Sequence, residues 1–219
     1  TTLRLAQANL LGYKNYADYV LERQMAMNPA GVYKLLDDLY EASFAVAKKE
    51  KAELEKFAKK SGFEGEIMPW DWSYYSDKLK VEKFDINDEM LKPYFELSKV
   101  VDGVFGLATE LYGIKFSPNK EIPVYHEEVT AYEVMDADGK FLSVFYTDFH
   151  PREGKRGGAW MNDFKSQWKE NGVDSRPHVT IVMNFTRPTE TIPALLTFSE
   201  VETFLHEFGH ALHGMLANS

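Results

Sequence analysis

Residues 199–216 read SEVETFLHEFGHALHGML, and their apolar spacing predicts one amphipathic helix. Ser199, with Glu202 three residues later, forms a capping-box pattern that marks the start of this helix. Within the helix, residues 206–210 have the arrangement HExxH. Such a short pattern also arises by chance, so its position on a capped helix is what makes it informative.

The spacing of His206, Glu207 and His210 suits a metal site. At about 100° per residue, the two histidines lie about 40° apart in azimuth and one turn apart in height, so both imidazoles can bind one ion. Glu207 lies about 60° from His210 and flanks that ion. Zinc bound by neutral imidazoles lowers the pKa of a bound water to about 7, and a nearby carboxylate can move its proton to a leaving amine. The motif predicts zinc-dependent peptide-bond hydrolysis, with His206 and His210 as metal ligands and Glu207 as general base.

A catalytic zinc usually has three protein ligands, and the spacing does not reveal the third. His213 lies about 10 Å further along a straight helix than His206, too far to share its ion. The nine residues after His210 contain no Asp, Glu or Cys. The upstream candidates, none favoured by spacing, are His126, Asp148, His150, Glu153 and His178. We therefore expect the metal site within this chain to be incomplete.

The first half of the chain predicts helices. Apolar residues at spacings of three and four predict helices over residues 13–27 and from Pro29 to a stop near Gly62. Further helices are expected from Pro69 and over residues 93–113. We expect this helical region to span residues 1–113.

The second half predicts strands before the HExxH helix. Residues 129–136 and 140–149 alternate in polarity around a hairpin signal, and residues 178–185 form another β segment. The expected fold class is therefore mainly α with a small antiparallel β-sheet (α+β). The sheet and the zinc helix are expected to form a region over residues 114–219. The last β segment either pairs with a substrate as an edge strand or lies inside the sheet.

Two side-chain clusters allow two interpretations each. Residues 48–60 carry a run of charges over a thin apolar seam, and a solvated helix face is favoured over a partner-binding face. Residues 70–75 are rich in aromatics, and core packing is favoured over a ligand pocket.

Composition excludes several classes of function. The chain has 219 residues, with 25 Lys and Arg against 34 Asp and Glu, so its formal net charge is −9. This charge would repel nucleic acids, and no nucleic-acid partner is expected. No apolar run is long enough to span a bilayer, so no membrane partner is expected either. The absence of cysteine excludes disulfides and thiolate metal sites.

The chain resembles the thimet oligopeptidase family of zinc metallopeptidases, and especially its bacterial peptidyl-dipeptidase (dipeptidyl carboxypeptidase) branch. The segment LTFSEVETFLHEFGHALHGML, residues 196–216, carries the strongest likeness. The other similar segments, in chain order, are ANLLGYKNYADYVLERQMA, PWDWSYY, PYFELSKVVDGVFGLATELYGI, DFHPREGKRGGAW and NFTRP. The resemblance covers essentially the whole chain.

This resemblance implies a zincin-like metallopeptidase fragment in which a small sheet lies beside a deep substrate channel. It implies one Zn²⁺ per complete catalytic domain, with a third ligand, a Glu, beyond residue 219. The chain starts at Thr1 without an initiator Met and ends just after the zinc helix, so we expect an internal fragment that is inactive alone and lacks tightly bound zinc. By the same resemblance, Arg152, Arg156, Gly157 and Gly158 bind substrate, although a simple connecting loop is the alternative.

The expected function is the release of C-terminal dipeptides from oligopeptide substrates by the complete enzyme. An endo-acting oligopeptidase of the same family is the closest alternative. A non-catalytic helical peptide-binding module is the alternative from another class. We expect the enzyme in the cytoplasm, with the periplasm as the alternative, and the sequence carries no signal for an oligomeric state.

Overall fold

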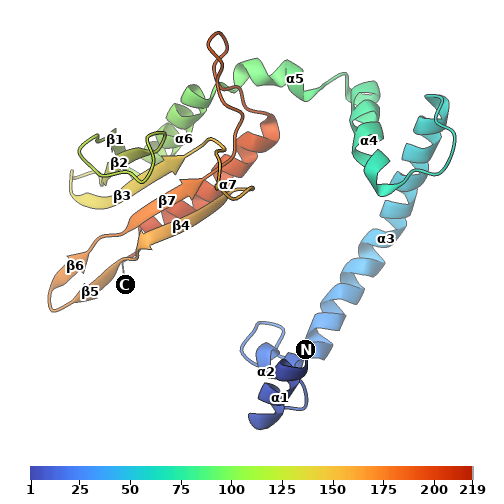
Figure 1. Cartoon of the computed structure of the whole chain (residues 1–219), viewed down its shortest axis with the longest axis horizontal. Coiled ribbons are helices and arrows are strands. Elements are labelled where there is room, and N and C mark those ends of the chain that lie inside the picture. Colours follow the sequence, from blue (N-terminus) through green and yellow to red (C-terminus); the bar gives the residue numbers. More distant parts are fainter. Residues whose placement is uncertain (219) are drawn as a thin grey trace. The chain divides into compact units, whose positions relative to one another are not determined.

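A computed structural model describes residues 1–218 and divides the chain into two compact units, Thr1–Asp85 and the part that begins at Ile86. The first unit is entirely helical (Figure 1). Its helices are α1 (Thr2–Leu10), α2 (Tyr16–Leu21), α3 (Pro29–Lys60) and α4 (Pro69–Phe84).

The helix expected over residues 13–27 is wrong at both ends. Asn15 caps α2 by accepting a hydrogen bond from the backbone N–H of Asp18, so the helix begins only at Tyr16. After Leu21 the chain runs through turns to Met27, whose positive φ of 61° is incompatible with a right-handed helix. The predicted start of the next helix at Pro29 is confirmed, with Asn28 as its cap.

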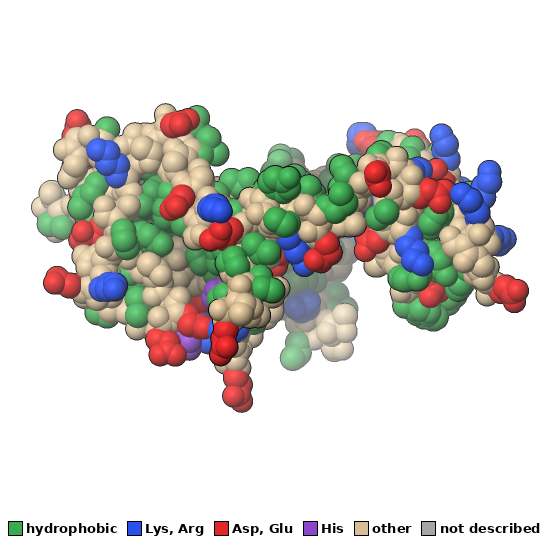
Figure 2. Space-filling model, turned by 90° about the horizontal axis from the view of Figure 1, so that it is seen from above, with side chains coloured by type: hydrophobic (Ala, Val, Ile, Leu, Met, Phe, Trp, Pro, Cys, Tyr) green, Lys and Arg blue, Asp and Glu red, His purple; other side chains and the backbone are tan. Residues whose placement is uncertain are grey.

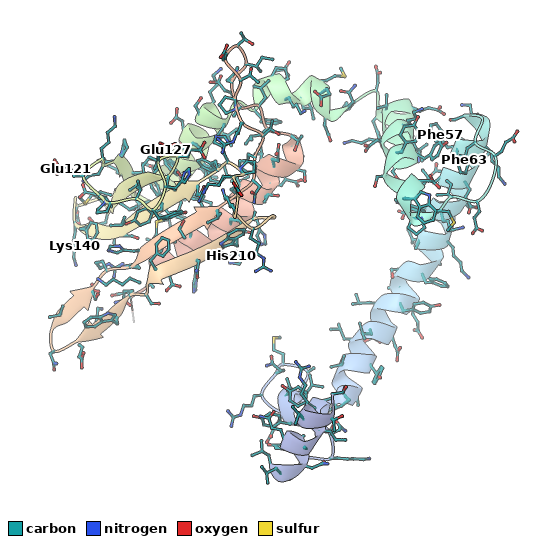
Figure 3. The ribbon with its side chains drawn as sticks, viewed as in Figure 1. Phe57, Phe63, Glu121, Glu127, Lys140 and His210 are labelled. Atoms are coloured by element: carbon teal, nitrogen blue, oxygen red, sulfur yellow. The ribbon has the colours of Figure 1, made fainter. Side chains whose placement is uncertain are left out.

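Helices α3 and α4 pack through the apolar seam noted in the sequence. Leu54, Phe57 and Ala58 are the buried residues of α3, and Leu54 and Ala58 form a small core with Ile67. Figure 3 labels Phe57 and Phe63 at this junction. The charges around the seam form ion pairs between the two helices, Lys60 with Glu82 and Lys83 with Glu53. Side chains of both signs are interspersed there, as Figure 2 shows.

The aromatic segment over residues 70–75 packs less than expected. Tyr75 lies against the small core and contacts the ring of Phe63 at a centroid distance of 5.2 Å. Trp70 and Tyr74 remain 76% and 56% exposed. Core packing is therefore confirmed for Tyr75 and wrong for these two side chains.

The second unit combines helices with a sheet. Its elements, in chain order, are α5 (Asp88–Leu91), a 3-10 helix (Lys92–Tyr94), α6 (Leu97–Tyr112), β1 (Lys115–Pro118), β2 (Thr130–Met135), β3 (Phe141–Asp148), β4 (Trp160–Lys165), β5 (Trp168–Glu170), β6 (Val173–Ser175), β7 (His178–Val182) and α7 (Phe198–Met215). The helix expected from Pro93 begins only at Leu97. The residues before Leu97 are extended and form an isolated β-bridge with the segment before α7. In this bridge, Leu97 N donates to Ala194 O and Leu196 N donates to Phe95 O.

Five strands form the main sheet in the order β1-β2-β3-β7-β4, and β5 and β6 form a separate ribbon. The α+β class is confirmed, including the β2–β3 hairpin. The sheet is mixed, however, because β3 and β7 run parallel while the other pairs are antiparallel. The connection between these two parallel strands contains β4, which returns to pair with the far side of β7.

Helix α7 covers one face of this sheet (Figure 1). Its buried side chains are Phe204, Phe208, Ala211 and Met215, which recur at helical spacing. They share the main core with sheet residues such as Phe145, Val179 and Ile181. The HExxH residues are thus carried by a helix whose opposite face is firmly buried. Within the described part of the chain, no helix has the length and apolar character needed to cross a membrane.

Candidate metal and peptidase site

The start of α7 lies two residues earlier than the sequence pattern suggests. Thr197 is the N-cap, and it exchanges hydrogen bonds with Glu200 in a capping box. Ser199, the expected cap, already lies in the helix and accepts a hydrogen bond at its carbonyl from Thr203. Thr197 has this role because the preceding residue is held in extended backbone, where Leu196 donates to Phe95 O.

His206 and His210 converge on the exposed face of α7. Their Nε2 atoms lie 3.2 Å apart, and the two rings stand nearly perpendicular with centroids 4.8 Å apart. Both side chains are exposed, and Figure 3 labels His210 on the helix. The imidazole nitrogens predicted as metal ligands are therefore brought together by the helix alone.

This pair fits a zinc ion. Tetrahedral zinc with nitrogen ligands at about 2.0–2.1 Å places two ligand atoms roughly 3.3 Å apart. The separation of 3.2 Å between the Nε2 atoms matches that geometry with little rearrangement. Imidazole is also a ligand that zinc prefers. The two histidines could thus supply two of the four ligands of a tetrahedral site.

Glu207 lies on the side of α7 that faces β4. It is separated by seven residues from Gly214, so the two share one side of the helix. Gly214 lies against Met161 of β4 and Val179 of β7. Glu207 is half-buried, whereas His213 is exposed one turn beyond His210. By helix geometry, Glu207 therefore occupies a position between the exposed histidine face and the face of α7 that packs on the sheet.

Three of the five upstream residues considered as a third ligand, Asp148, His150 and His126, have other partners. The carboxylate of Asp148 is bound by Arg152, Lys155 and Tyr125. His150 places Nδ1 at 3.2 Å from Phe185 O, and His126 lies beside Glu128. Among residues 1–218, no group of three or more His, Asp or Glu side chains is arranged to hold a metal ion.

Asp148 lies at the end of β3 with a side chain that is only 1% exposed. Burial by itself would raise the pKa of its carboxyl, but hydrogen bonds from Arg152, Lys155 and Tyr125 outweigh burial and hold the pKa at about 2. Burial and the bond to Asp148 raise the pKa of the Tyr125 hydroxyl to about 12. Burial also lowers the pKa of Lys155, although Asp148 opposes this effect. Nothing in the sequence spacing singled out this cluster.

The glycine-rich loop after β3 carries the other predicted site residues. Arg152 directs both terminal nitrogens at Asp148, at 2.7 and 2.8 Å. Arg156, Gly157 and Gly158 are exposed. Gly158 has a φ of 91°, a conformation that favours glycine. Arg152 is thus paired with Asp148, whereas Arg156 is exposed to solvent.

β7 is an interior strand, paired with β3 on one side and β4 on the other. The interpretation of residues 178–185 as a substrate-pairing edge is therefore wrong. The free edge beside α7 belongs to β4, which ends the sheet order. Among residues 1–218, no strand pairs with the other side of β4, and an edge of this kind can accept an extended peptide.

Arg176 fastens the other end of the helix and was missed by sequence reasoning. Its terminal nitrogens donate to Met215 O and Ala217 O at 2.9 and 3.0 Å, and its Nε donates to Leu142 O at 2.8 Å. These partners lie 34 to 41 residues away along the chain, so no local pattern could have shown them. A cation at a helix C-terminus also complements the helix dipole.

A helix that carries HExxH is the motif of the metallopeptidases called zincins. The model of Peptidase family M3 matches residues 1–219, and the chain belongs to this family.

Curated relatives agree with this family. Oligopeptidase A of Escherichia coli is 42% identical over 215 residues, which cover 98% of this chain and 32% of the relative. Dipeptidyl carboxypeptidase of Escherichia coli is 40% identical over 216 residues, which cover 98% of this chain and 31% of the relative. Organellar oligopeptidase A of Arabidopsis thaliana is 44% identical over 225 residues. The chain thus spans about a third of the length of the curated relatives it matches.

Proposed function

We propose that the protein is a zinc-dependent peptidase that acts on oligopeptides. The observation that carries this proposal is the 3.2 Å separation of the His206 and His210 Nε2 atoms, with Glu207 half-buried on the same helix. A zinc ion held by these imidazoles would supply the Lewis acidity that makes water nucleophilic near neutral pH. The names of the relatives, oligopeptidase and dipeptidyl carboxypeptidase, support peptides as the substrate class.

The chain's own residues supply the proton transfer and the alignment. Glu207 accepts the proton of the attacking water and returns it to the amine nitrogen that leaves. An extended peptide that adds to the free edge of β4 would lie beside α7, which packs on β4 and carries Glu207. The peptide carbonyl is thereby held close to both the base and the histidine pair.

We also propose that the third zinc ligand is a Glu beyond residue 219. The two imidazoles would fill half of a tetrahedral site, and no group of three possible ligands is found among the described residues. Residues 1–219 alone are expected to bind zinc weakly and to have negligible peptidase activity. Zinc titration of this segment tests the proposal, because tight one-to-one binding would contradict an outside ligand.

The release of C-terminal dipeptides is the finer proposal. It needs a cation that recognises a free C-terminal carboxylate, and Arg156 on the glycine-rich loop is exposed for that role, with Gly157 and Gly158 beside it. Arg152 remains a weaker candidate because Asp148 occupies its terminal nitrogens. Relatives of both kinds have similar identity, so an endo-acting oligopeptidase is the second candidate.

One comparison separates these two activities. The full-length protein is given one peptide with a free C-terminus and the same peptide with an amidated C-terminus. We expect cleavage two residues from the free end and a large loss on amidation. Equal cleavage of both peptides would refute the dipeptidase proposal and favour the endopeptidase.

The alternative of a non-catalytic peptide-binding module is tested by Glu207→Gln, because a catalytic protein should lose turnover in this variant while zinc stays bound. The boundary between a helical region over residues 1–113 and a sheet and zinc-helix region over residues 114–219 stays a prediction. The cytoplasmic location also stays a prediction. Within the structure, α6 ends at Tyr112 and β1 begins at Lys115.

A further inference from the structure

One buried carboxylate organises the glycine-rich loop. Asp148 accepts hydrogen bonds from both terminal nitrogens of Arg152 at 2.7 and 2.8 Å, from Lys155 Nζ at 2.8 Å and from Tyr125 OH at 2.9 Å. Arg152 and Lys155 lie four and seven residues further along the chain. The loop therefore folds back so that two of its cations meet at the strand it has just left.

Both halves of the loop are tied to the sheet. In the first half, Lys155 Nζ also donates to His150 O at 2.6 Å and to Asp148 O at 3.2 Å, and its side chain is only 3% exposed. In the second half, the amide of Asn184 donates to Arg156 O at 3.0 Å and to Gly158 O at 2.6 Å. Asn184 follows β7, so the loop is held between two neighbouring strands.

The same bonds determine what the loop presents to solvent. Arg152 and Lys155 are paired with Asp148, which leaves Arg156 as the exposed cation of the loop. A Cβ built on Gly157 or Gly158 would meet no atom of the described residues within 4 Å. The backbone there is open to a close approach by another chain.

We infer that Asp148 is a positioning residue for substrate binding: its buried network holds residues 150–158 so that Arg156 and the backbone of Gly157 and Gly158 face a peptide. This inference rests on the proposed peptidase function. A loop already held in its binding shape loses less conformational entropy when substrate binds. Without the carboxylate, the buried Lys155 and the partly buried Arg152 lose their counter-charge, and the loop is released.

Limited trypsin digestion of the full-length protein tests the loop directly. Trypsin cleaves after Arg152, Lys155 and Arg156 only when the loop opens. In Asp148→Asn, we expect nicking at these bonds to be at least about ten-fold faster, because hydrogen bonds to a charged group are worth that factor or more. Nicking within residues 48–60 serves as the internal reference. Asp138→Asn, which changes an exposed Asp in the β2–β3 turn, is the matched control and should leave the loop nicking rate unchanged.

Kinetics then test the positioning role. In Asp148→Asn, we expect KM for a peptide to rise about ten-fold while kcat changes by less than about three-fold, since binding and not proton transfer is affected. Arg156→Gln should raise KM as well, and adding Asp148→Asn to it should have little further effect because both act through one contact. A fall in kcat with unchanged KM would overturn the inference.

Each failure has its own signature. If trypsin cuts the loop of Asp148→Asn at the wild-type rate, Asp148 does not hold residues 150–158 in place. If trypsin cuts faster but KM is unchanged, the Asp148 network has no role in substrate binding. An inactive wild-type protein, or an active Glu207→Gln variant, would instead refute the proposed function. If Asp148→Asn does not fold, Tyr125→Phe removes a single donor from the network. It should raise both the nicking rate and KM to a smaller extent, and unchanged values would overturn the inference.

Discussion

His206 and His210 face each other on the exposed side of α7 with 3.2 Å between their Nε2 atoms, while Phe204 and Phe208 anchor the opposite side in the core. The histidine spacing therefore depends on a helix that the sheet holds in register. A metal site built on such a helix has its first two ligands prearranged.

Replacement of His206 by Gln should abolish tight zinc binding by the full-length protein. Loss of groups that merely orient ligands costs about 10- to 100-fold in metal affinity, so loss of a ligand should cost at least about 100-fold. Zinc content after dialysis measures the effect. His213→Gln, on the same helix and equally exposed, is the matched control and should retain wild-type zinc. Zinc loss in the control alone would reverse the ligand assignment.

Replacement of Glu207 by Gln should leave zinc bound and remove turnover. General acid–base catalysis contributes about 10²- to 10⁴-fold, and kcat should fall by a factor in that range. Peptide cleavage and zinc content are measured on the same preparation. Unchanged turnover would contradict the role of Glu207 as base. If wild type and variant were both inactive, the non-catalytic peptide-binding module would be favoured instead.

The Asp148 network should give the protein an acid-sensitive component of stability. The folded pKa of Asp148, about 2, lies below the value of about 3.9 expected in the unfolded chain. Because the folded pKa is lowered, the stabilisation is complete above about pH 4 and is lost as the pH falls towards 2; it amounts to about 2 kcal/mol.

The measurement is the free energy of unfolding of wild type and Asp148→Asn at pH 6 and pH 3. The difference between the two proteins should shrink by about 1 kcal/mol or more at the lower pH. Asp138→Asn should show no such change relative to wild type. A difference for Asp148→Asn that is independent of pH would disprove the depressed pKa.

Two glycines of α7 should respond to alanine in opposite directions. A Cβ on Gly214 would lie 2.9 Å from Met161 Cε and 3.3 Å from Val179 Cγ2, whereas one on Gly209 meets no described atom within 4 Å. Met161 can move, but Val179 lies in the core and must shift, so Gly214→Ala should destabilise by about 1 kcal/mol. Gly209→Ala should stabilise by about 0.5–1 kcal/mol through helix propensity. Thermal unfolding of both variants measures this contrast, and a stabilising Gly214→Ala would contradict the packing of α7 on β4.

Arg176→Gln should loosen the C-terminal end of α7. The variant leaves the carbonyls of Met215 and Ala217 without their charged donor, at a cost of about 2 kcal/mol. Hydrogen exchange of the backbone amides in the last turn of α7 should speed up, while those near Thr197 should not. Uniform protection along the helix would show that Arg176 contributes nothing there.

Local patterns predicted much of the fold. Asn28 before Pro29, the apolar seam through Leu54 and the β2–β3 hairpin are all set by neighbouring residues, and all appear in the structure. The mixed sheet did not follow from such patterns. The parallel pairing of β3 with β7 joins segments about thirty residues apart, and alternation alone does not give strand direction.

The candidate site shows the same division. The convergence of His206 and His210 follows from helical geometry, so sequence sufficed. The roles of Asp148 and Arg176 depend on tertiary contacts. Because most Asp and Arg residues are simply solvated on the surface, the residue type alone did not predict these roles. The cap at Thr197 was missed because the expected capping box was Ser199 with Glu202, whereas the extended backbone at Leu196, paired with Phe95, places the helix start at Thr197 with Glu200.

α7 is fastened at both ends by groups other than the metal: the capping box of Thr197 and Glu200 at one end and Arg176 at the other. The helix that carries the histidines therefore owes its shape to the protein alone. Removal of zinc by a chelator should leave an intact apoprotein, in contrast to small zinc domains that unfold without their ion. The protein should then lose and regain the proposed zinc ion as a reversible exchange, without a cycle of unfolding.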